Sequence, residues 1–318
     1  MEEVQNQKTS EKRSKNQNIW LWRVLFTICA VGAVLAIGSL VYRTIHRNHV
    51  EQLLEQLADQ TDSDDSAQMP QEESVMPEPV ETDEPVVKKT WEQLTLKEKN
   101  QLLEEYFGIE IPDKNIDFSA LQEEINPDIY AWIYIPNTLI DYPVLQHLND
   151  NAYYLNYNID GTKGYPGCIY TENYNAKDFT DRNTVIYGHN MKNGTMFGAL
   201  HQYEDNDFFT ENPYVYIYTT DEVYVYRVFA AYEFSDIHLL GGYDMVTEVG
   251  FGKYLEEVMK NESKNGNFDR DIEVTAKDKI ITLSTCVSKK PKNRYLVQGV
   301  LLRIEEEVDS SFALGEAE

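Results

Sequence analysis

One apolar run near the N-terminus constrains this chain more than any other feature. Residues 19–42 (IWLWRVLFTICAVGAVLAIGSLVY) hold a single charge, Arg23. As a helix rising 1.5 Å per residue, the run is about 36 Å long, enough to cross a hydrocarbon core of about 30 Å. A cleavable signal peptide would have an apolar region of only about 7–15 residues with a small-x-small site close behind it. Here the small residues lie inside the run, so we expect one uncleaved transmembrane helix.

The charges on either side of this run predict its orientation. Four basic residues precede it, at positions 8, 12, 13 and 15, whereas an acidic stretch begins soon after it. Lys and Arg near the ends of a membrane helix favour the cytoplasmic side. Residues 1–18 are therefore predicted to be cytoplasmic, residues 19–42 to form a single-pass anchor in the cell membrane, and the rest to lie outside the cell.

Residues 43–89 are predicted to form a flexible acidic linker. Between positions 51 and 87 the chain has twelve Asp or Glu residues and four prolines but no Lys or Arg. Like charges repel, and a segment with little apolar surface cannot pack, so it stays extended and solvated. Capture of a basic partner by this segment is the alternative. The whole chain has 28 Lys and Arg against 54 Asp and Glu, a net charge of −26, which argues against a nucleic acid partner because phosphate binding needs a basic surface.

The segment from residue 90 to residue 126 is predicted to be helical. Apolar side chains recur at helical spacing from Thr90, which would cap the helix, to Gly108, which would stop it. A second, shorter helix is expected over residues 120–125, and Pro127 ends it.

From residue 127 to residue 305, short β-type runs separated by turn residues predict a domain that is mainly β. The expected strands are residues 131–135, 140–144, 167–170, 184–187, 214–218, 223–229, 279–285 and 295–304. Helical patches interrupt them at residues 195–203 and 244–259. Eight strands with few helices indicate a closed barrel or a sandwich. Residues 306–318 are expected to form an acidic tail.

A cysteine stands at the end of one of the last two strands. Cys286 closes the run ITLSTC, and Arg294 opens the next strand eight residues later. Residues 287–293 are basic and contain a proline, so we expect a loop that leaves Cys286 and Arg294 on neighbouring strand ends. Nearby positive charge favours the nucleophilic thiolate. A lone cysteine is more often a small buried hydrophobe, which is our interpretation of Cys168, and a Cys168–Cys286 disulfide is a further alternative.

A thiolate that attacks an acyl group also needs a proton donor and acceptor. His189 suits that role because it ends an apolar strand, and Gly188 allows the backbone to turn sharply there. His147, His201 and His238 lie on predicted loops or helix surfaces without a partner pattern, so we assign them no function. The sequence has no zinc-ligand spacing, P-loop or dinucleotide-binding glycine pattern, and we predict no metal and no cofactor.

Together, these segments resemble the sortase family. The segment TLSTC at residues 282–286, followed by Arg294, is similar to the sortase signature Thr-Leu-x-Thr-Cys and its arginine. The segment NTVIYGHNMKNGTMFGAL at residues 183–200 resembles the histidine motif of class B sortases in particular. The same class also matches at residues 150–155, 167–170 and 244–259. The resemblance covers residues 127–304 and the anchor.

This resemblance implies an eight-stranded sortase-type β-barrel with N-terminal helices, and a membrane-anchored cysteine transpeptidase of Gram-positive bacteria. Cys286 would attack a threonine carbonyl in the C-terminal sorting motif of a secreted protein and form a thioacyl intermediate. An amine of the peptidoglycan precursor (lipid II) would resolve that intermediate. His189 would give a proton to the leaving amine and take one from the incoming amine. Arg294 would stabilise the oxyanion or hold the substrate backbone.

The resemblance also implies a substrate groove. Asn151, Leu155, Tyr187 and Ser284 match positions at which class B enzymes contact the sorting motif, although Asn151 and Leu155 are equally consistent with a turn residue and a core leucine. Ser288, two residues after the cysteine, departs from the acidic residue that some class B relatives carry there. A catalytic role for that acid therefore does not transfer to this chain.

Three other functions are alternatives. An extracellular cysteine protease would pass the acyl group to water. A non-catalytic surface-anchored protein would bind a partner through its Tyr-rich hairpin at residues 214–226. A pilus-attaching or pilin-polymerising sortase would act on pilin, although the Asp-Pro-aromatic lid motif common in polymerising sortases is not found in this sequence.

Overall fold

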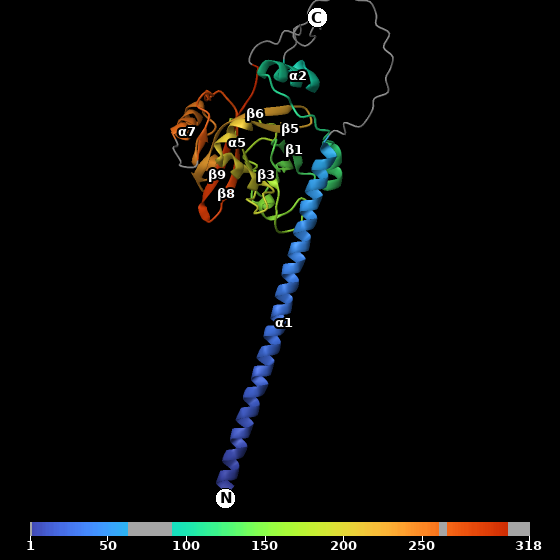
Figure 1. Ribbon diagram of the computed structural model, residues 1–318, viewed down its shortest axis with the longest axis vertical. Helices are drawn as coiled ribbons and strands as arrows, with labels where there is room; N and C mark the ends of the chain where they lie inside the picture. Colours follow the sequence, from blue (N-terminus) through green and yellow to red (C-terminus); the bar gives the residue numbers. More distant parts are fainter. Residues whose placement is uncertain (1, 63–90, 261–265, 305–318) are drawn as a thin grey trace, which may run out of the picture. The chain divides into compact units, whose positions relative to one another are not determined.

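The computed structural model describes residues 2–62, 91–260 and 266–304 (Figure 1). The chain divides into two compact units, residues 1–51 and residues 52–318. Two predicted segments, the linker from residue 63 onward and the acidic tail at residues 306–318, lie outside the described residues.

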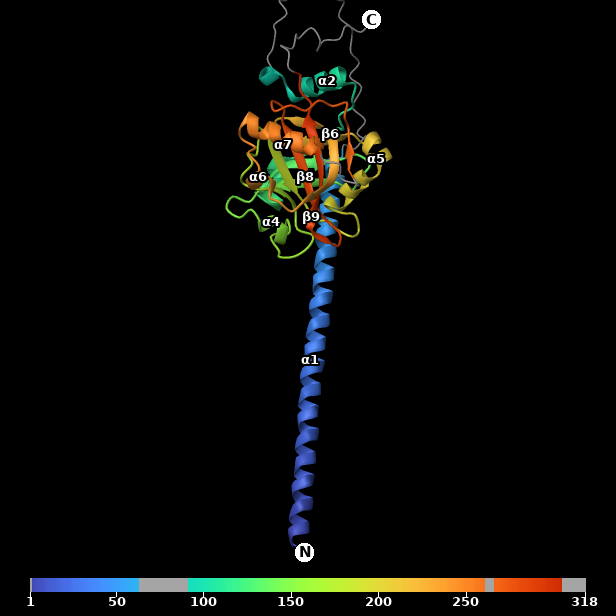
Figure 2. The ribbon, with the colours of Figure 1, turned by 90° about the vertical axis from the view of Figure 1, so that its left-hand side faces the viewer.

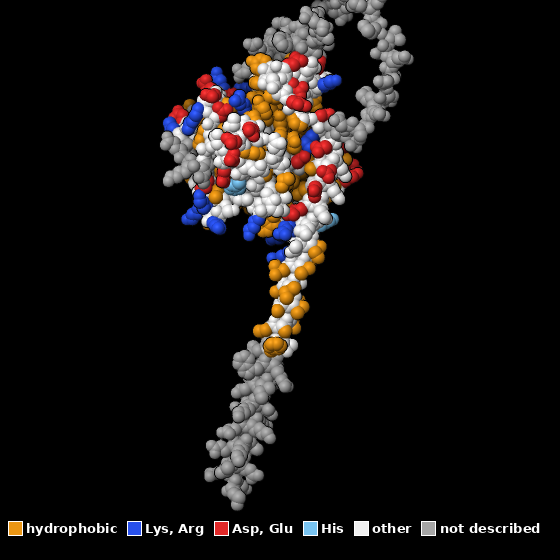
Figure 3. Space-filling view, in the orientation of Figure 1, with side chains coloured by type: hydrophobic (Ala, Val, Ile, Leu, Met, Phe, Trp, Pro, Cys, Tyr) orange, Lys and Arg blue, Asp and Glu red, His pale blue; other side chains and the backbone are white. Residues whose placement is uncertain are grey.

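Helix α1, Glu2–Thr61, confirms that the apolar run is helical. From Phe26 onward it includes a stretch long and apolar enough to cross a membrane, none of which is buried. Figure 3 shows apolar side chains along this part of the helix. The expected start of the linker at residue 43 is wrong, because the helix continues to Thr61. Leu54 and Leu57 are 5% and 6% exposed, so this acidic segment carries an apolar stripe that packs.

A short helical layer precedes the barrel. It consists of η1 (Trp91–Gln93), α2 (Leu96–Phe107), α3 (Phe118–Ala120) and η2 (Leu121–Ile125), the last of which confirms the second predicted helix. The predicted cap residue, Thr90, lies outside the described residues. Thr95 caps α2, because its hydroxyl accepts the Glu98 N–H while the Glu98 carboxylate accepts the Thr95 N–H. The stop at Gly108 is confirmed, since Gly108 adopts the left-handed conformation with φ 64°.

Eight strands close into a barrel. They are β1 (Ile129–Tyr134), β2 (Asp141–Leu145), β3 (Ile169–Thr171), β4 (Asn183–Tyr187), β5 (Tyr214–Tyr218), β6 (Val223–Ser235), β8 (Ile280–Val287) and β9 (Lys290–Leu301). They follow the order β5-β1-β2-β3-β4-β8-β9-β6, and the pairing of β6 with β5 closes the ring. All eight predicted strands are therefore confirmed, as a barrel rather than a sandwich. The two-residue strand β7 (Asn267–Phe268), which pairs with β6, is too short to give a sequence signal.

Short helices fill the connections between strands. They are α4 (Tyr153–Asn156), η3 (Phe197–Glu204), α5 (Asn206–Glu211), α6 (Leu239–Gly242) and α7 (Glu248–Lys260). Of these, η3 and α7 confirm the two predicted helical patches. Helix α7 buries Phe251, Tyr254 and Leu255 in one cluster with the barrel residues Phe229 and Leu296, and Figure 2 shows the helix lying over the strands.

A buried chain of hydrogen bonds joins α7 to the central strands. Gln298 of β9 donates to the Tyr254 hydroxyl at 2.6 Å and to the Thr282 hydroxyl at 2.8 Å. Thr282 of β8 in turn donates to the Asn183 side chain of β4 at 2.8 Å. Because buried polar groups must find partners, this network favours one register for β4, β8 and β9. That register determines which side chains meet at the end of the barrel.

Candidate active site

The site forms where the parallel strands β4 and β8 end. In their register Tyr187 lies opposite Ser284, and the Gly188 N–H donates to the Ser284 carbonyl at 3.2 Å. His189 and Cys286 each follow the aligned pair by two residues. Since the carboxyl ends of parallel strands meet at one edge of a sheet, the two residues leave the barrel side by side.

Arg294 reaches the same edge from the other neighbour of β8. It lies directly opposite Cys286 in the antiparallel pair of β8 and β9. Beyond this pair the register shifts, and residues 291–293 form a bulge in β9. The Nη1 atom of Arg294 donates to two carbonyls of this bulge, at 3.0 and 3.1 Å.

The loop predicted over residues 287–293 is wrong. β8 ends at Val287 and β9 begins at Lys290, so two residues form the turn, and the second, Lys289, takes φ 63°. The bulge accommodates Pro291, which cannot donate a ladder hydrogen bond. Figure 3 shows Lys and Arg side chains at the lower edge of the domain, where this hairpin turns in Figure 1.

Six of the seven predicted site residues line one pocket of about 340 Å³. They are Leu155, Tyr187, His189, Ser284, Cys286 and Arg294. Cys286 is exposed, so a solute can reach its thiol. The seventh residue, Asn151, is not among the residues that line the pocket. Its side-chain oxygen accepts the main-chain N–H of Asn173 at 2.8 Å and so joins two loops.

His189 is oriented by a main-chain group. Its Nε2 lies 2.7 Å from the Leu155 carbonyl, and its ring packs on Tyr165 with the centroids 4.8 Å apart. A carbonyl can only accept, so Nε2 carries the hydrogen in the neutral ring and Nδ1 is the basic nitrogen. Gly167, with φ 70°, leaves room for this arrangement, because a side chain there would come within 3.2 Å of the imidazole.

His238, which lines the pocket, and Glu172, which does not, form a pair that the sequence does not reveal. Glu172 follows β3 and is 13% exposed, and its carboxylate accepts from His238 Nε2 at 2.6 Å and from the Tyr187 hydroxyl at 3.4 Å. Burial raises the pKa of Tyr187, and the Glu172 charge raises it further. The expectation that His238 has no partner is wrong. The two residues are 66 positions apart, and only the barrel brings them together.

Among the other histidines and cysteines, His147 and Cys168 have structural surroundings, whereas His201 lies next to Cys286. His147 accepts the Asp150 N–H at 2.9 Å within its own loop, as a structural residue does. His201, to which we assigned no function, lies 3.1 Å from the Cys286 carbonyl. Cys168 is buried, burial raises the pKa of its thiol, and all three cysteines are free. This confirms the packing role of Cys168 and rules out the Cys168–Cys286 disulfide in this structure.

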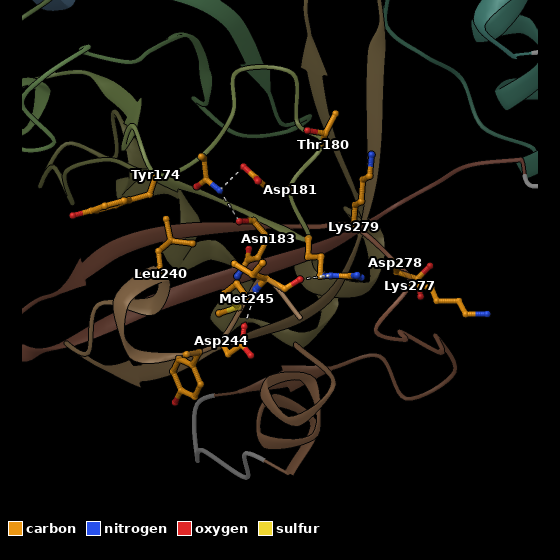
Figure 4. Close-up of a pocket in the computed structure, with 14 residues that line it drawn as sticks. Tyr174, Thr180, Asp181, Asn183, Leu240, Asp244, Met245, Lys277, Asp278 and Lys279 are labelled. Carbon is orange, nitrogen blue, oxygen red and sulfur yellow. Dashed lines mark hydrogen bonds between the residues drawn. The ribbon is translucent and has the colours of Figure 1, made fainter. Parts of the chain in front are cut away.

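A larger hollow, of about 580 Å³, lies beyond α6 (Figure 4). Leu239 of α6 lines the smaller pocket and Leu240 lines the hollow. The carboxylates of Asp181 and Asp244 in this hollow already accept hydrogen bonds from neighbouring residues. Among the described residues that line it there is no cysteine and no histidine. The three predicted catalytic residues all line the smaller pocket.

Comparison with known proteins assigns this chain to a family. The model of the sortase domain matches residues 133–302, more than half of the chain. The chain belongs to the sortase family. Sortase B of Listeria monocytogenes is 37% identical to this sortase over 182 residues, which are 57% of this chain and 72% of the relative.

Solved structures place this sortase in class B. The structure of Clostridium perfringens sortase B is 31% identical with a TM-score of 0.53, and the match covers 59% of this chain and 100% of that one. Sortase B from Bacillus anthracis, solved in complex with AAEK1, is 34% identical with a TM-score of 0.51, and the match covers 59% of this chain and 84% of that one. At the family level, the activity is that of a cysteine transpeptidase.

Proposed function

We propose that this class B sortase cleaves a C-terminal sorting motif of secreted proteins after its threonine and joins the new end to an amine of the peptidoglycan precursor. One observation carries the proposal: a thiol, an imidazole and a guanidinium line the same pocket from the ends of three adjacent strands. Leu155, Tyr187 and Ser284, which line the same pocket, are the side chains we propose to contact the sorting motif.

In the first half-reaction, the Cys286 thiolate attacks the carbonyl carbon of the threonine. A C–S bond forms and the carbonyl oxygen becomes negative. When the tetrahedral intermediate collapses, the C–N bond breaks, and His189 as imidazolium gives its proton to the leaving amine. The product is a thioester on Cys286.

In the second half-reaction, His189 takes a proton from the incoming amine. The amine nitrogen attacks the thioester carbonyl, a C–N bond forms, and the C–S bond breaks to return the thiolate. The oxyanion of both steps needs a donor. The Arg294 guanidinium has five N–H groups, of which Nη1 contacts the bulge, so others remain for the substrate. A cationic donor in this role contributes about 10²–10³ in rate.

The decisive experiment is cleavage of a peptide library by the full-length protein in detergent micelles, with products identified by mass spectrometry. Cys286→Ala is expected to abolish cleavage, and a methanethiosulfonate to block it. Cys168→Ala, the matched control, is expected to keep it because Cys168 is buried. Unchanged turnover in Cys286→Ala would end the proposal. With an excess of a glycine peptide as amine, water as the main acceptor would identify a protease instead.

We further propose that α1 crosses the membrane once, with its N-terminus inside. The exposed thiol of Cys286 allows a direct test. In a variant with Cys29→Ala and Cys168→Ala, a membrane-impermeant maleimide should label Cys286 on intact cells. Labelling that appears only after lysis would reverse the orientation, and Cys286→Ala is the blank.

A further inference from the structure

Beyond the last main-chain bond between β4 and β8, a side chain continues the pairing. The Gly188 N–H donates to the Ser284 carbonyl, and the Cys286 carbonyl, two residues on, points to the same side of β8. The side-chain amide of Asn190, two residues after Gly188, donates to this carbonyl at 2.7 Å, and His201 Nε2 lies 3.1 Å from the same oxygen. The main chain of Asn190 pairs instead with Met196 in an isolated bridge.

His201 and Glu204 determine which way the Asn190 amide points. His201 Nδ1 lies 2.7 Å from Glu204 Oε1, so Nδ1 carries the hydrogen. In the neutral ring Nε2 is then an acceptor, and Asn190 Nδ2 lies 2.9 Å from it. The ring is stacked on Tyr295 with the centroids 4.9 Å apart. An amide held in this way presents its N–H groups, and not its oxygen, to the Cys286 carbonyl.

This network includes a group on, or directly next to, each of the three residues of the proposed mechanism. Asn190 directly follows His189, Tyr295 directly follows Arg294, and the carbonyl belongs to Cys286 itself. Within the described part of the chain, the residues that line the pocket do not include Asn190 or Tyr295, nor His201 or Glu204. The network therefore acts on the reacting groups through the main chain.

We propose that Asn190 is a positioning residue, oriented by His201 and Glu204, that holds the main chain of Cys286 in place relative to His189. We call the hold of the Asn190 side chain on the Cys286 main chain the clamp. The kinetic part of this inference rests on the proposed function, whereas the clamp does not. A displacement of about 1 Å between reacting groups costs about 10² in rate. Loss of the clamp therefore lowers kcat, while KM for the peptide, which depends on the pocket wall, changes little.

The test compares Asn190→Ala with Asn267→Ala in the full-length protein in detergent micelles. Asn267 is a matched control, because its side-chain amide donates to the Tyr203 carbonyl at 2.8 Å without contacting Cys286. Two quantities are measured: deuterium uptake of the peptide spanning residues 284–289, and kcat and KM for a peptide selected from the library. His201→Gln, which keeps an acceptor for Asn190, is compared with His201→Leu, which does not.

We expect Asn190→Ala to raise deuterium uptake at residues 284–289 and to lower kcat about 10- to 100-fold, with KM within about twofold. His201→Leu should show a smaller loss that His201→Gln largely restores, and Asn267→Ala should change neither quantity. Unchanged uptake in Asn190→Ala overturns the clamp. Raised uptake with unchanged kcat, or an equal loss in Asn267→Ala, overturns the positioning role. If the wild-type protein cleaves no peptide, the proposed function fails, and the uptake comparison still decides whether the clamp exists.

Discussion

Arg294 lies directly opposite Cys286 on the neighbouring strand, and its Nη1 donates to two carbonyls of the bulge at residues 291–293. The bulge therefore holds one edge of the guanidinium. The opposite edge keeps donors that can face the pocket. Bulges beside active sites commonly aim a side chain in this way. The bulge that contains Pro291 therefore helps to hold the Arg294 side chain in place.

This support leads to a prediction for Arg294→Lys. We expect kcat to fall about 10²-fold, because an ammonium is a single point donor that cannot hold the bulge and an oxyanion together. Arg294→Ala is expected to lose about 10³. Steady-state kinetics with the selected peptide measure both. Arg227→Lys makes the same change at a surface pair with Asp269 and should leave kcat unaltered. A value for Arg294→Lys within twofold of wild type would contradict the role.

Leu155 lines the pocket and Asn151 does not, so substitutions at these two positions should affect KM differently. Leu155 is 40% exposed on the pocket wall, so Leu155→Ala removes apolar surface that a bound peptide covers. We expect KM to rise about fivefold, which corresponds to about 1 kcal/mol of lost burial. The carbonyl that holds His189 is main chain and stays. Asn151→Ala should leave KM within twofold and lower the melting temperature slightly. A larger KM effect at Asn151 would extend the groove to that loop.

The sequence predicts the barrel and the catalytic edge because both are local patterns. Short β-type runs of four to ten residues mark the predicted strands. His189 and Cys286 stand where apolar runs end, so the parallel pairing of those runs is enough to bring them together. The resemblance adds the roles, which the spacing alone does not give.

The features that the sequence misses depend on contacts between distant segments. Asn190 and the Cys286 carbonyl are 96 positions apart, and Glu172 and His238 are 66 apart, so no local pattern encodes either contact. The hairpin after Cys286 resembles a loop because its residues are charged, but exposed strand ends tolerate charge. The continuation of α1 to Thr61 includes Leu54 and Leu57, whose burial the acidic composition of this segment does not suggest.

A buried lysine joins the segment after α1 to the barrel. The Lys114 side chain is 2% exposed, and its Nζ lies 2.6 Å from Asp62 and 2.7 Å from Asp141. Burial alone would lower the pKa of Lys114, but its hydrogen bonds to the two carboxylates outweigh burial and raise the pKa. Lys114→Met leaves the Asp141 carboxylate largely buried without its cation. We expect this variant to lose about 3–5 kcal/mol of unfolding free energy.

Urea unfolding of the full-length protein in micelles measures this loss. Lys260→Met is the matched control, because it makes the same change in an exposed pair with Glu256. Such pairs contribute at most about 1 kcal/mol. Equal losses in the two variants would mean that the buried ion pairs add nothing to the stability of the barrel.

Buried tyrosines predict how the barrel responds to high pH. Burial raises the pKa of Tyr254 to about 12, and it also raises the pKa of Tyr203, Tyr226 and Tyr232. An unfolded tyrosine ionises near pH 10, so the folded state binds these protons more tightly. Their contribution to stability is complete below pH 10 and is lost as the pH rises toward the folded pKa values. For Tyr254 alone, the loss between pH 10 and 12 is about 3 kcal/mol.

We therefore expect unfolding above pH 10, in which tyrosinate absorbance and loss of the far-ultraviolet circular dichroism signal follow one curve. Tyr106 is 66% exposed, so Tyr106→Phe, the matched control, should leave the midpoint of this transition unchanged. Ionisation of the buried tyrosines near pH 10 with the circular dichroism signal intact would show that solvent reaches the core. In that case, packing of α7 against the barrel would not exclude water from the Tyr254 hydroxyl, to which Gln298 donates.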